Sequence, residues 1–383
     1  MHYLDNAATT MVARPVAEAI YKTMTEHWAN PSSLYNPGNE SKKLLDRARA
    51  AVAASMGAAA DEVFFTGCGS ESNNIALLGA VAARKSWGHK IVVSGVEHPS
   101  VSLPLQRLSE EGFQVEVVNP GENGQLDVEE FASHIDKNTI LAACMQVNNE
   151  TGAQVEVNRL AHLIKEKNSR TAFHVDGVQA WMRVPTDLTG IDSYTVSGHK
   201  IHAPKGVGAL YLRKGHNIVP PYLGGGQEKG HTGFQVMGVR PGTENLPYAV
   251  GLATAASIMH KNRPQRKAQV AQLNRQLREG IAALPEIVVN SPENAVEEVL
   301  NISTNCIKSE TMLHFLETKN IYVSSGSACA KGAASPTLAA MGLSSRRMDT
   351  ALRISLCGDN TAQDVQALLQ GLQEGLETLA RIR

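Results

Sequence analysis

The sequence contains few cysteines and few aromatic residues, and neither sign of charge dominates it. Five of its 383 residues are cysteines and 5% are aromatic. The cysteines are odd in number, widely spaced and form no CxxC pair, which argues against a disulfide framework and against a cysteine-based zinc site. We therefore expect reduced thiols, a cytoplasmic location and no bound metal.

Long hydrophobic runs are also absent. No apolar run approaches the roughly 18 residues that a membrane helix needs, and the opening stretch, MHYLDNAATT, lacks the basic segment and apolar core of a secretory signal. The net charge is −1, so we expect no membrane partner and no direct contact with nucleic acid. The hydrophobic fraction (43%) and the charged fraction (19%) are those of a soluble globular protein.

The chain does contain an alternation of short apolar runs and helical patterns, from about residue 60 to residue 255. The runs are rich in β-branched and aromatic residues and are followed by polar turns, as buried strands are. This alternation predicts an α/β fold with a mostly parallel sheet between helices. The seven predicted strands lie in EVFFTG, KIVVSGVEH, FQVEVVN, TILAACMQVNN, TAFHVD, SYTVSG and VGALYLR.

The pattern changes toward the carboxyl terminus, where charged, helix-prone residues lead into shorter strands. A final helix is expected after Thr361, which can form a cap with Asp364. We predict a large domain over residues 15–255 and a small α+β domain made of residues 1–14 and 256–383.

Polar residues of the kinds used in catalysis follow five of the predicted strands. In parallel sheets, ligands bind beyond the carboxyl ends of the strands. The sequence therefore predicts a binding site at this edge, built from TGCGSESNN, VEHPS, VNNE, HVDGVQ and SGHK.

Two of these motifs fit a carbonyl cofactor. Lys200 follows a strand directly, and a lysine held there can form a Schiff base when its pKa is lowered. Asp176 ends another strand, where a carboxylate can face the pyridinium nitrogen of pyridoxal phosphate (PLP), and Gln179 can bind the phenolic oxygen. Each has a plainer alternative, because most lysines are solvated surface residues and an aspartate at such a turn often caps a helix.

Two further motifs could hold the rest of the cofactor. Gly69 and Ser70 begin a predicted helix after a strand and could bind a phosphate at the amino terminus of that helix. An ordinary capped helix with no ligand would have the same sequence pattern. His98 precedes Pro99, a good first helical residue, and could stack on a ring or move a proton. A lone histidine is more often structural.

Ten motifs together closely resemble the NifS/IscS-type cysteine desulfurases, in the class V branch of the fold-type-I PLP enzymes. The resemblance runs from residue 3 to about residue 357 and implies a PLP cofactor, L-cysteine as substrate, a homodimer and a sulfur-acceptor protein. The resemblance does not identify the sulfur acceptor, which could be an iron–sulfur scaffold, a tRNA-thiolation protein or a DNA phosphorothioation protein. The motifs are LDNAATT, NPSS, TGCGSESNN, EHPSV, VNNETG, HVDGVQ, SGHKIHAPKGVGALY, GGGQEKG, PGTEN and SSGSACAKG.

The resemblance assigns a role to individual residues. It makes Lys200 the Schiff-base lysine and Cys329 the nucleophile, with His98 over the ring as a third catalytic residue. Asn149 and Arg353 would bind the substrate, Arg353 through the carboxylate. The implied cofactor contacts are Gly69, Ser70, His98, Asn149, Asp176, Gln179, Ser197, His199, Lys200 and, from the other subunit, Thr243.

Cys329 lies among Ser, Gly and Ala residues, which impose little side-chain bulk. By the resemblance its thiolate attacks the substrate's sulfur and becomes a persulfide, while alanine leaves. A thiol ordinarily has a pKa of about 8.5, so Lys331 or His98 is expected to help form the thiolate. Of the other cysteines, we expect Cys144, Cys306 and Cys357 in the core and Cys68 as a small filler in the phosphate turn.

One segment departs from the family pattern. GGGQEKGHTGFQVMGVRPGTEN carries about eight extra residues, around residues 231–238, and has Pro241 where the family usually has serine. The insertion lies beside Thr243, so the role of that residue is less secure. It either shapes an acceptor surface or is a tolerated loop extension.

Three alternatives share much of this evidence. A selenocysteine lyase, or another class V lyase or aminotransferase, would keep the same cofactor residues, although SGSAC favours desulfuration. A non-catalytic sulfur-carrier subunit would have no need of the full set of Lys200, Asp176, His98 and Cys329. A generic nucleotide-binding protein lacks support, because no convincing GxGxxG follows the first strand and no GxxxxGK[ST] loop is present.

Overall fold

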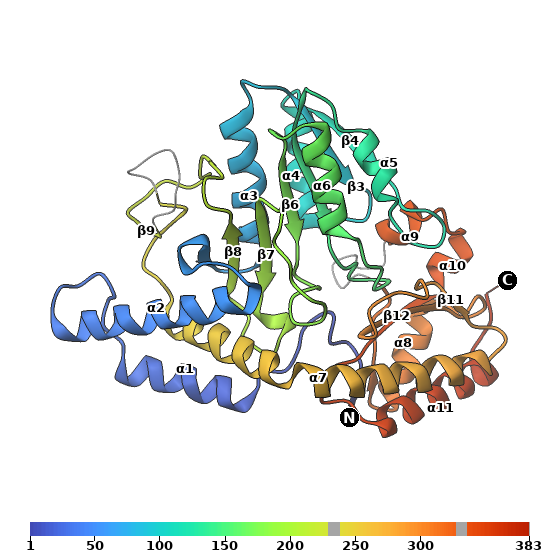
Figure 1. The fold of residues 1–383 in the computed structure, drawn as a ribbon. Helices are drawn as coiled ribbons and strands as arrows, with labels where there is room; N and C mark the ends of the chain where they lie inside the picture. Colours follow the sequence, from blue (N-terminus) through green and yellow to red (C-terminus); the bar gives the residue numbers. More distant parts are fainter. Residues whose placement is uncertain (229–237, 327–334, 383) are drawn as a thin grey trace.

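A seven-stranded sheet forms the centre of the protein, in a computed structural model that describes residues 1–228, 238–326 and 335–382 (Figure 1). The strand order is β2-β8-β7-β6-β5-β3-β4, and all strands are parallel except β8, which is antiparallel to both neighbours. This confirms the predicted α/β fold, and each strand lies within its predicted run. The strands are β2 (Val63–Thr66), β3 (Lys90–Ser94), β4 (Gln114–Val118), β5 (Thr139–Met145), β6 (Ala172–Asp176), β7 (Ser193–Ser197) and β8 (Gly208–Leu212).

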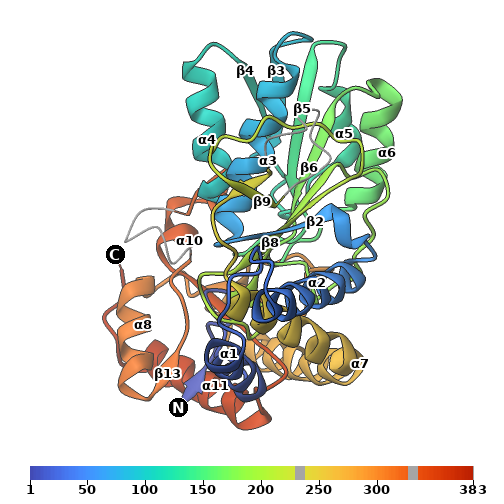
Figure 2. The same cartoon turned by 90° about the vertical axis from the view of Figure 1, so that its left-hand side faces the viewer.

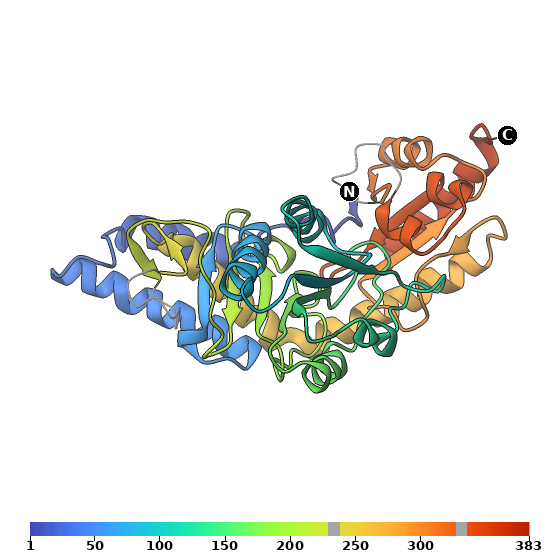
Figure 3. The same ribbon diagram turned by 90° about the horizontal axis from the view of Figure 1, so that it is seen from above.

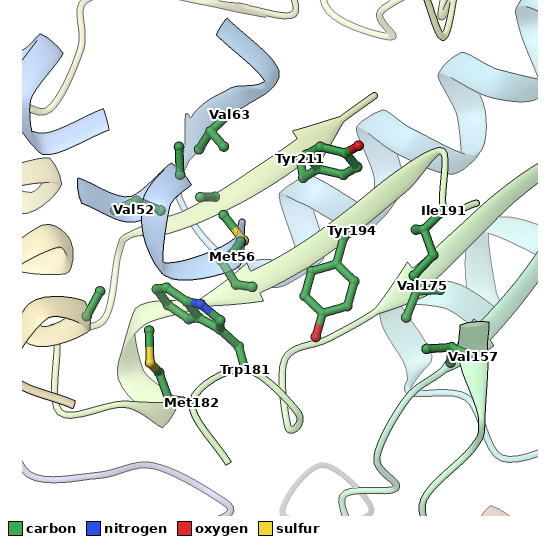
Figure 4. Close-up of a cluster of buried hydrophobic side chains, with 14 of the residues drawn as sticks. Val52, Met56, Val63, Val157, Val175, Trp181, Met182, Ile191, Tyr194 and Tyr211 are labelled. Atoms are coloured by element: carbon green, nitrogen blue, oxygen red, sulfur yellow. The ribbon is translucent and has the colours of Figure 1, made fainter. Parts of the chain in front are cut away.

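Helices cover both faces of this sheet because successive strand residues point to opposite sides. In β3, Ile91 and Val93 pack in a cluster with α3 and α4, whereas Val92 belongs to the larger core on the other face, with α2, α5, α6 and α7. Figure 4 shows part of that larger core, where Met56 lies near Trp181. The helices are α1 (Arg14–Glu26), α2 (Asn36–Met56), α3 (Gly69–Arg84), α4 (Pro99–Glu110), α5 (Val128–Ser133) and α6 (Val157–Lys167), with short 3-10 turns at Ala60–Glu62 and Gly198–Lys200.

A 37-residue helix, α7 (Leu246–Ala282), joins this core to a second one. Its residues up to Ala256 pack against the large sheet, and residues 270–281 pack in a separate apolar cluster with β12 and β14. Figure 1 shows α7 running beneath both parts of the molecule. The predicted domain boundary between residues 255 and 256 falls inside this helix.

The second core is built on two small sheets. An antiparallel sheet has the order β11-β12-β14, and β1 pairs in parallel with β13, which brings the first residues of the chain to this end of the molecule. The elements are β1 (His2–Tyr3), β11 (Val288–Val289), β12 (Val299–Ser303), β13 (Ile321–Tyr322), β14 (Ala351–Ser355), α8 (Ser309–Thr318), α9 (Pro336–Ala340), α10 (Ser345–Asp349) and α11 (Ala362–Thr378). A further antiparallel pair consists of β9 (Gly226–Glu228) and β10 (Arg240–Pro241).

Several local predictions are confirmed. Thr361 caps α11, since its backbone N–H donates to Asp364 Oδ2 at 2.8 Å. Cys144 and Cys306 are buried, as expected of core residues, and Cys357 is half-buried. No helix within the described residues is both long enough and apolar enough to cross a membrane.

Candidate active site

The five polar strand ends meet at one cavity of about 210 Å³ at the carboxyl edge of the sheet. Three residues from outside the large sheet, Ala7, Ala8 and Arg353, complete its wall. The structure therefore brings together ten of the residues singled out from the sequence: Gly69, Ser70, His98, Asn149, Asp176, Gln179, Ser197, His199, Lys200 and Arg353.

Lys200 ends the short helical turn after β7 and points at the amino-terminal segment of the chain. Its Nζ donates hydrogen bonds to the carbonyl oxygens of Ala7 and Ala8, each at 2.8 Å. The pKa of Lys200 is lowered to about 7, chiefly by burial. The positive charges of Arg183 and Arg353 lower this pKa as well, and the negative charges of Asp5 and Asp176 offset only part of the effect. A lysine in this state can lose its proton near neutral pH, as a nucleophilic amine must.

Asp176 ends β6 and is 5% exposed. Its Oδ2 accepts a hydrogen bond from Asn73 Nδ2 at 2.8 Å, and its Oδ1 accepts one from the backbone N–H of Val178 at 2.9 Å. Asn73 is held in turn by His174, whose Nε2 lies 3.0 Å from Asn73 Oδ1. These bonds fix the carboxylate at the cavity wall.

The sequence analysis missed the supporting residues Asn73 and His174. Burial lowers the pKa of His174 to about 3, so the ring is neutral. Its Nδ1 lies 2.8 Å from Ser193 Oγ, which leaves Nε2 as the donor to Asn73. The sequence contained one indication of the role of His174. It lies two residues before Asp176 on β6, so the two side chains lie on the same face of the strand.

A second buried carboxyl group, Glu97, was also missed. Burial raises its pKa to about 8, and the nearby charge of Asp176 acts in the same direction. Glu97 Oε1 accepts hydrogen bonds from the Met145 backbone N–H at 2.6 Å and from the Ser94 hydroxyl. Oε2 has no partner among the described residues. With a pKa of about 8, the Glu97 side chain is mostly protonated at pH 7.

Gly69 and Ser70 lie at the amino terminus of α3, where the capping residue Cys68 makes no side-chain hydrogen bond to the first turn. A Cβ at Gly69 would lie 2.8 Å from Val178 Cγ2 and 3.5 Å from Ser197 Cβ, so glycine lets the start of α3 pack closely against the strand ends that line the cavity. Backbone N–H groups and the helix dipole at such a terminus favour an anion.

His199 and His98 lie near this terminus and are held in their neutral forms. Burial lowers the pKa of His199 to about 4, with Lys200 as the next cause. Burial also lowers the pKa of His98, against the effect of Asp176. His98 Nδ1 accepts the Ser100 backbone N–H at 3.1 Å, so it caps α4 and its Nε2 carries the ring proton.

Arg353, on β14, is 2% exposed and enters the cavity from the small domain. Its Nη1 donates to the Asn149 carbonyl oxygen at 3.0 Å, and its Nη2 donates to Asp5 Oδ1 at 2.8 Å. Its buried Nε has no partner among the described residues. Gln179 donates from Nε2 to the Ala7 carbonyl oxygen at 2.9 Å and accepts from Arg183.

Two predicted site residues, Thr243 and Cys329, are not among the residues described above. Thr243 is exposed, follows β10 and does not line the cavity of its own chain. Cys329, together with Lys331, falls in residues 327–334, outside the described part of the chain. Most of the predicted insertion, residues 229–237, also falls outside it.

The chain is similar in sequence to known proteins. The family Aminotransferase class-V matches residues 2–368 of the chain. A cysteine desulfurase of Nostoc sp. is 37% identical, over 98% of this chain and 93% of its own length. The chain belongs to the class-V aminotransferase family. Its resemblance to the cysteine desulfurases of that family, predicted from the ten motifs, is confirmed.

Solved structures agree with this assignment. A NifS-like protein superposes with a TM-score of 0.91 at 33% identity, covering 98% of this chain and 99% of that one. A structure described as SspA in complex with cysteine has a TM-score of 0.81 at 30% identity, covering 94% of this chain and all of that one. The protein is a PLP-dependent enzyme of fold type I.

The residues present fit PLP. The amino terminus of α3, where Gly69 and Ser70 line the cavity, suits a phosphate, and the fixed carboxylate of Asp176 suits a pyridinium nitrogen. Lys200, with its lowered pKa, lines the same cavity and suits the aldehyde carbon. The neutral side chains of His98 and His199 can offer the cofactor an aromatic face and a hydrogen-bond donor, and they add no charge to the cavity.

Proposed function

We propose that this enzyme removes the sulfur atom from L-cysteine in the cytoplasm, giving L-alanine and a persulfide on Cys329 that passes to an acceptor protein. The observation that supports this most strongly is the placement of Lys200, Asp176 and Arg353 around one cavity. An amino-acid substrate needs a base at its α-carbon, an electron sink and a cation for its carboxylate. Each need is met by one of these side chains or by the cofactor that they hold.

In this mechanism the bound PLP supplies an electron sink for the negative charge that develops on the substrate. Lys200 removes the α-proton, which its lowered pKa permits near pH 7. Arg353 binds the substrate carboxylate and fixes the α-carbon within reach of Lys200. Asp176 would hold the ring nitrogen in its protonated form, and His98, which lines the same cavity, would face the ring.

The sulfur transfer is then assigned to Cys329. Its thiolate attacks the substrate sulfur, so an S–S bond forms as the C–S bond breaks. The electron pair of the broken bond remains with the substrate carbon, which takes a proton, and alanine results. The products balance the reactants, because one thiol and one cysteine give one persulfide and one alanine.

The guanidinium of Arg353 already donates to two hydrogen-bond acceptors, and these fix its orientation in the cavity. The Asn149 carbonyl and Asp5 hold Nη1 and Nη2 from one side. Because a guanidinium has five N–H donors in a plane, the remaining N–H groups can still bind a carboxylate. Asp5 also offsets part of the positive charge that Arg353 brings into the buried cavity.

We further propose that the enzyme works as a homodimer. One end of the molecule, formed by α1, the start of α2 and the segment before β9, carries exposed apolar side chains (Figures 1 and 3). Figure 2 shows this end facing the viewer. Such a concentration is unusual for a monomer surface. The residues are Met11, Tyr21, Met24, Trp28, Leu34, Tyr35, Tyr222 and Leu223. Thr243, which is exposed and does not line the cavity of its own chain, would contact the phosphate bound in the other subunit.

A single set of assays tests the function. The purified protein should be yellow from bound PLP and should release alanine and, with a thiol reductant, sulfide from L-cysteine. Cys329→Ala should keep the colour and lose sulfide release, whereas Lys200→Ala should lose both the characteristic absorption and activity. A colourless wild-type protein, or a fully active Cys329→Ala variant, would refute the proposal.

A further inference from the structure

Gln179 is expected to bind the phenolic oxygen of PLP, and only the nitrogen end of its side-chain amide can donate a hydrogen bond to that oxygen. Gln179 is 5% exposed and lines the active-site cavity. Its Nε2 donates to the Ala7 carbonyl oxygen at 2.9 Å, and its Oε1 accepts a hydrogen bond from Arg183 Nη1. The end of the amide that lies toward the cavity therefore decides whether Gln179 can act as a donor there.

These two partners allow one orientation of the amide. A guanidinium has donors and no acceptor, whereas a carbonyl oxygen accepts and cannot donate. If the amide of Gln179 were turned by half a rotation, its N–H groups would face Arg183 and its oxygen would face the Ala7 carbonyl oxygen, so both hydrogen bonds would be lost. Ala7 lines the cavity and Arg183 is not among the lining residues. The nitrogen end therefore lies on the cavity side, and it has a second N–H group beyond the one that Ala7 accepts.

Arg183 is a buried cation placed for this contact. It follows Gln179 by four residues in the turn after β6, is 8% exposed, and its Nη1 also donates to the Gln179 backbone carbonyl oxygen at 3.3 Å. The preceding residue, Met182, has a φ of 69°, a left-handed conformation that residues other than glycine rarely adopt. Burial lowers the pKa of Arg183, which shows that the cation is desolvated. The chain accepts backbone strain and a buried charge at adjacent positions, which indicates that Arg183 has a role beyond connecting two strands.

Arg183 also acts on Lys200 through its charge. The two side chains line a second cavity of about 30 Å³ together with Glu298, and Lys200 lines the active-site cavity as well. The positive charge of Arg183 lowers the pKa of Lys200, and the negative charge of Glu298 raises the pKa of Arg183. An experiment on Arg183 must therefore separate its hydrogen bond to Gln179 from its charge.

We propose that Arg183 is a positioning residue that holds the amide of Gln179 with its nitrogen end toward the phenolic oxygen of the cofactor. The inference rests on the proposed function only through the role of Gln179 toward PLP, and it does not depend on the substrate. A donor at the phenolic oxygen stabilises the form of the bound cofactor in which this oxygen carries its full negative charge, so it lowers the pH at which the cofactor loses its proton. Without Arg183 the amide is free to turn, and its oxygen would then face an oxygen of the same sign.

The test is a double-mutant cycle of Arg183→Met and Gln179→Leu in the PLP-loaded protein. The measurement is the pH midpoint at which the absorption of the bound cofactor changes. Gln179→Leu removes the donor and should raise this midpoint by about 1 pH unit, because a hydrogen bond to a charged group changes an equilibrium by about tenfold or more. Arg183→Met should raise the midpoint by a similar amount in the wild-type background. In the Gln179→Leu background it should add less than about 0.3 pH unit, because the amide through which Arg183 acts is gone.

Three further variants complete the design. Arg183→Gln is too short to reach Oε1 and repeats the cycle with a polar side chain, should the methionine variant fail to fold. Arg183→Lys keeps a cation that can donate to Oε1, so its midpoint should stay within about 0.3 pH unit of wild type. Arg84→Met removes another buried arginine, at the carboxyl end of α3, and as the matched control it should leave the midpoint unchanged.

The outcomes separate the hydrogen bond from the charge. A rise that is equal in the two backgrounds would show that Arg183 acts through its charge and would overturn the proposal. A wild-type midpoint in Gln179→Leu, or in both neutral variants of Arg183, would overturn it as well. None of these measurements involves sulfur transfer, so a protein with the expected absorption that is inactive on cysteine would refute the proposed function and leave the result for Arg183 standing.

Discussion

The lowered pKa of Lys200 makes a quantitative prediction for the enzyme freed of its cofactor. A change from the ordinary 10.5 to about 7 corresponds to about 5 kcal/mol at 1.36 kcal/mol per pH unit. At pH 7 about half of the Lys200 side chains are then neutral, against about one in 3,000 for an ordinary lysine. Lys200 should therefore react with carbonyl compounds at neutral pH far faster than any exposed lysine does.

Borohydride trapping of an aldehyde adduct, quantified by mass spectrometry at each lysine, would measure this. The adduct at Lys200 should rise with pH with a midpoint near 7, and the exposed Lys42 serves as the internal reference. A midpoint near 10 at Lys200 would refute the reasoning, because it would show that burial beside Arg183 and Arg353 does not destabilise the ammonium form.

The same change in pKa affects stability. Between pH 7 and 10.5 the unfolded chain binds the Lys200 proton and the folded chain does not, so the unfolded state holds more protons. The contribution of Lys200 to the free energy of unfolding should therefore rise with pH over this window and be lost as the pH falls through 7. Denaturant titrations of the cofactor-free protein at pH 7 and pH 9, with Lys200→Met for comparison, would show this sign.

Three substitutions test the cofactor contacts, with PLP affinity measured by absorbance titration. Gly69→Val should reduce affinity by at least 10-fold, since even its Cβ would lie 2.8 Å from Val178 Cγ2 and the start of α3 would have to shift; normal affinity would show that the start of α3 does not hold the phosphate. Asn73→Leu removes a hydrogen bond to a carboxylate, worth about 1.5–3 kcal/mol, so affinity should fall by roughly 10-fold or more, and an unchanged value would exclude a role in orienting Asp176. Thr243→Ala should weaken PLP retention in the dimer, and retention equal to that of wild type would contradict the contact between subunits.

Most of the fold could be predicted because each strand of the large sheet carries its own local signal. Runs such as TILAACM are apolar throughout, as strands covered on both faces are, and the polar residues that follow them must lie at one edge. Lys200, Asp176 and His98 could therefore be placed together without coordinates. Their roles were only possibilities on the evidence of the residues, and the resemblance to a family was needed to assign them.

The residues that sequence analysis missed act through long-range contacts. Glu97, Asn73 and His174 are buried polar groups, and no pattern in the chain says which buried polar group faces which. Asn149 and Arg353, which are 204 positions apart in the sequence, show the same limit, because their contact depends on how the small domain sits against the sheet. Hydrophobic patterns with a period of two or 3.6 residues predict single strands or helices, and they do not predict contacts between distant elements.

Asp5 and Arg353 allow a final test, because they form one ion pair and act on Lys200 with opposite signs. Asp5 raises the pKa of Lys200 and Arg353 lowers it. In the cofactor-free enzyme, Asp5→Asn should therefore move the pH midpoint of Lys200 trapping below that of wild type, and Arg353→Met should move it above. Asp359→Asn, in an exposed carboxylate, should leave the midpoint unchanged. Shifts of the same sign in the two variants would mean that each substitution acts by opening the cavity to water, because better solvation of the ammonium raises the pKa in both cases. Opposite shifts would show that the charges of the pair set the protonation of the lysine, and that Asp5 tempers the effect of Arg353 on the base.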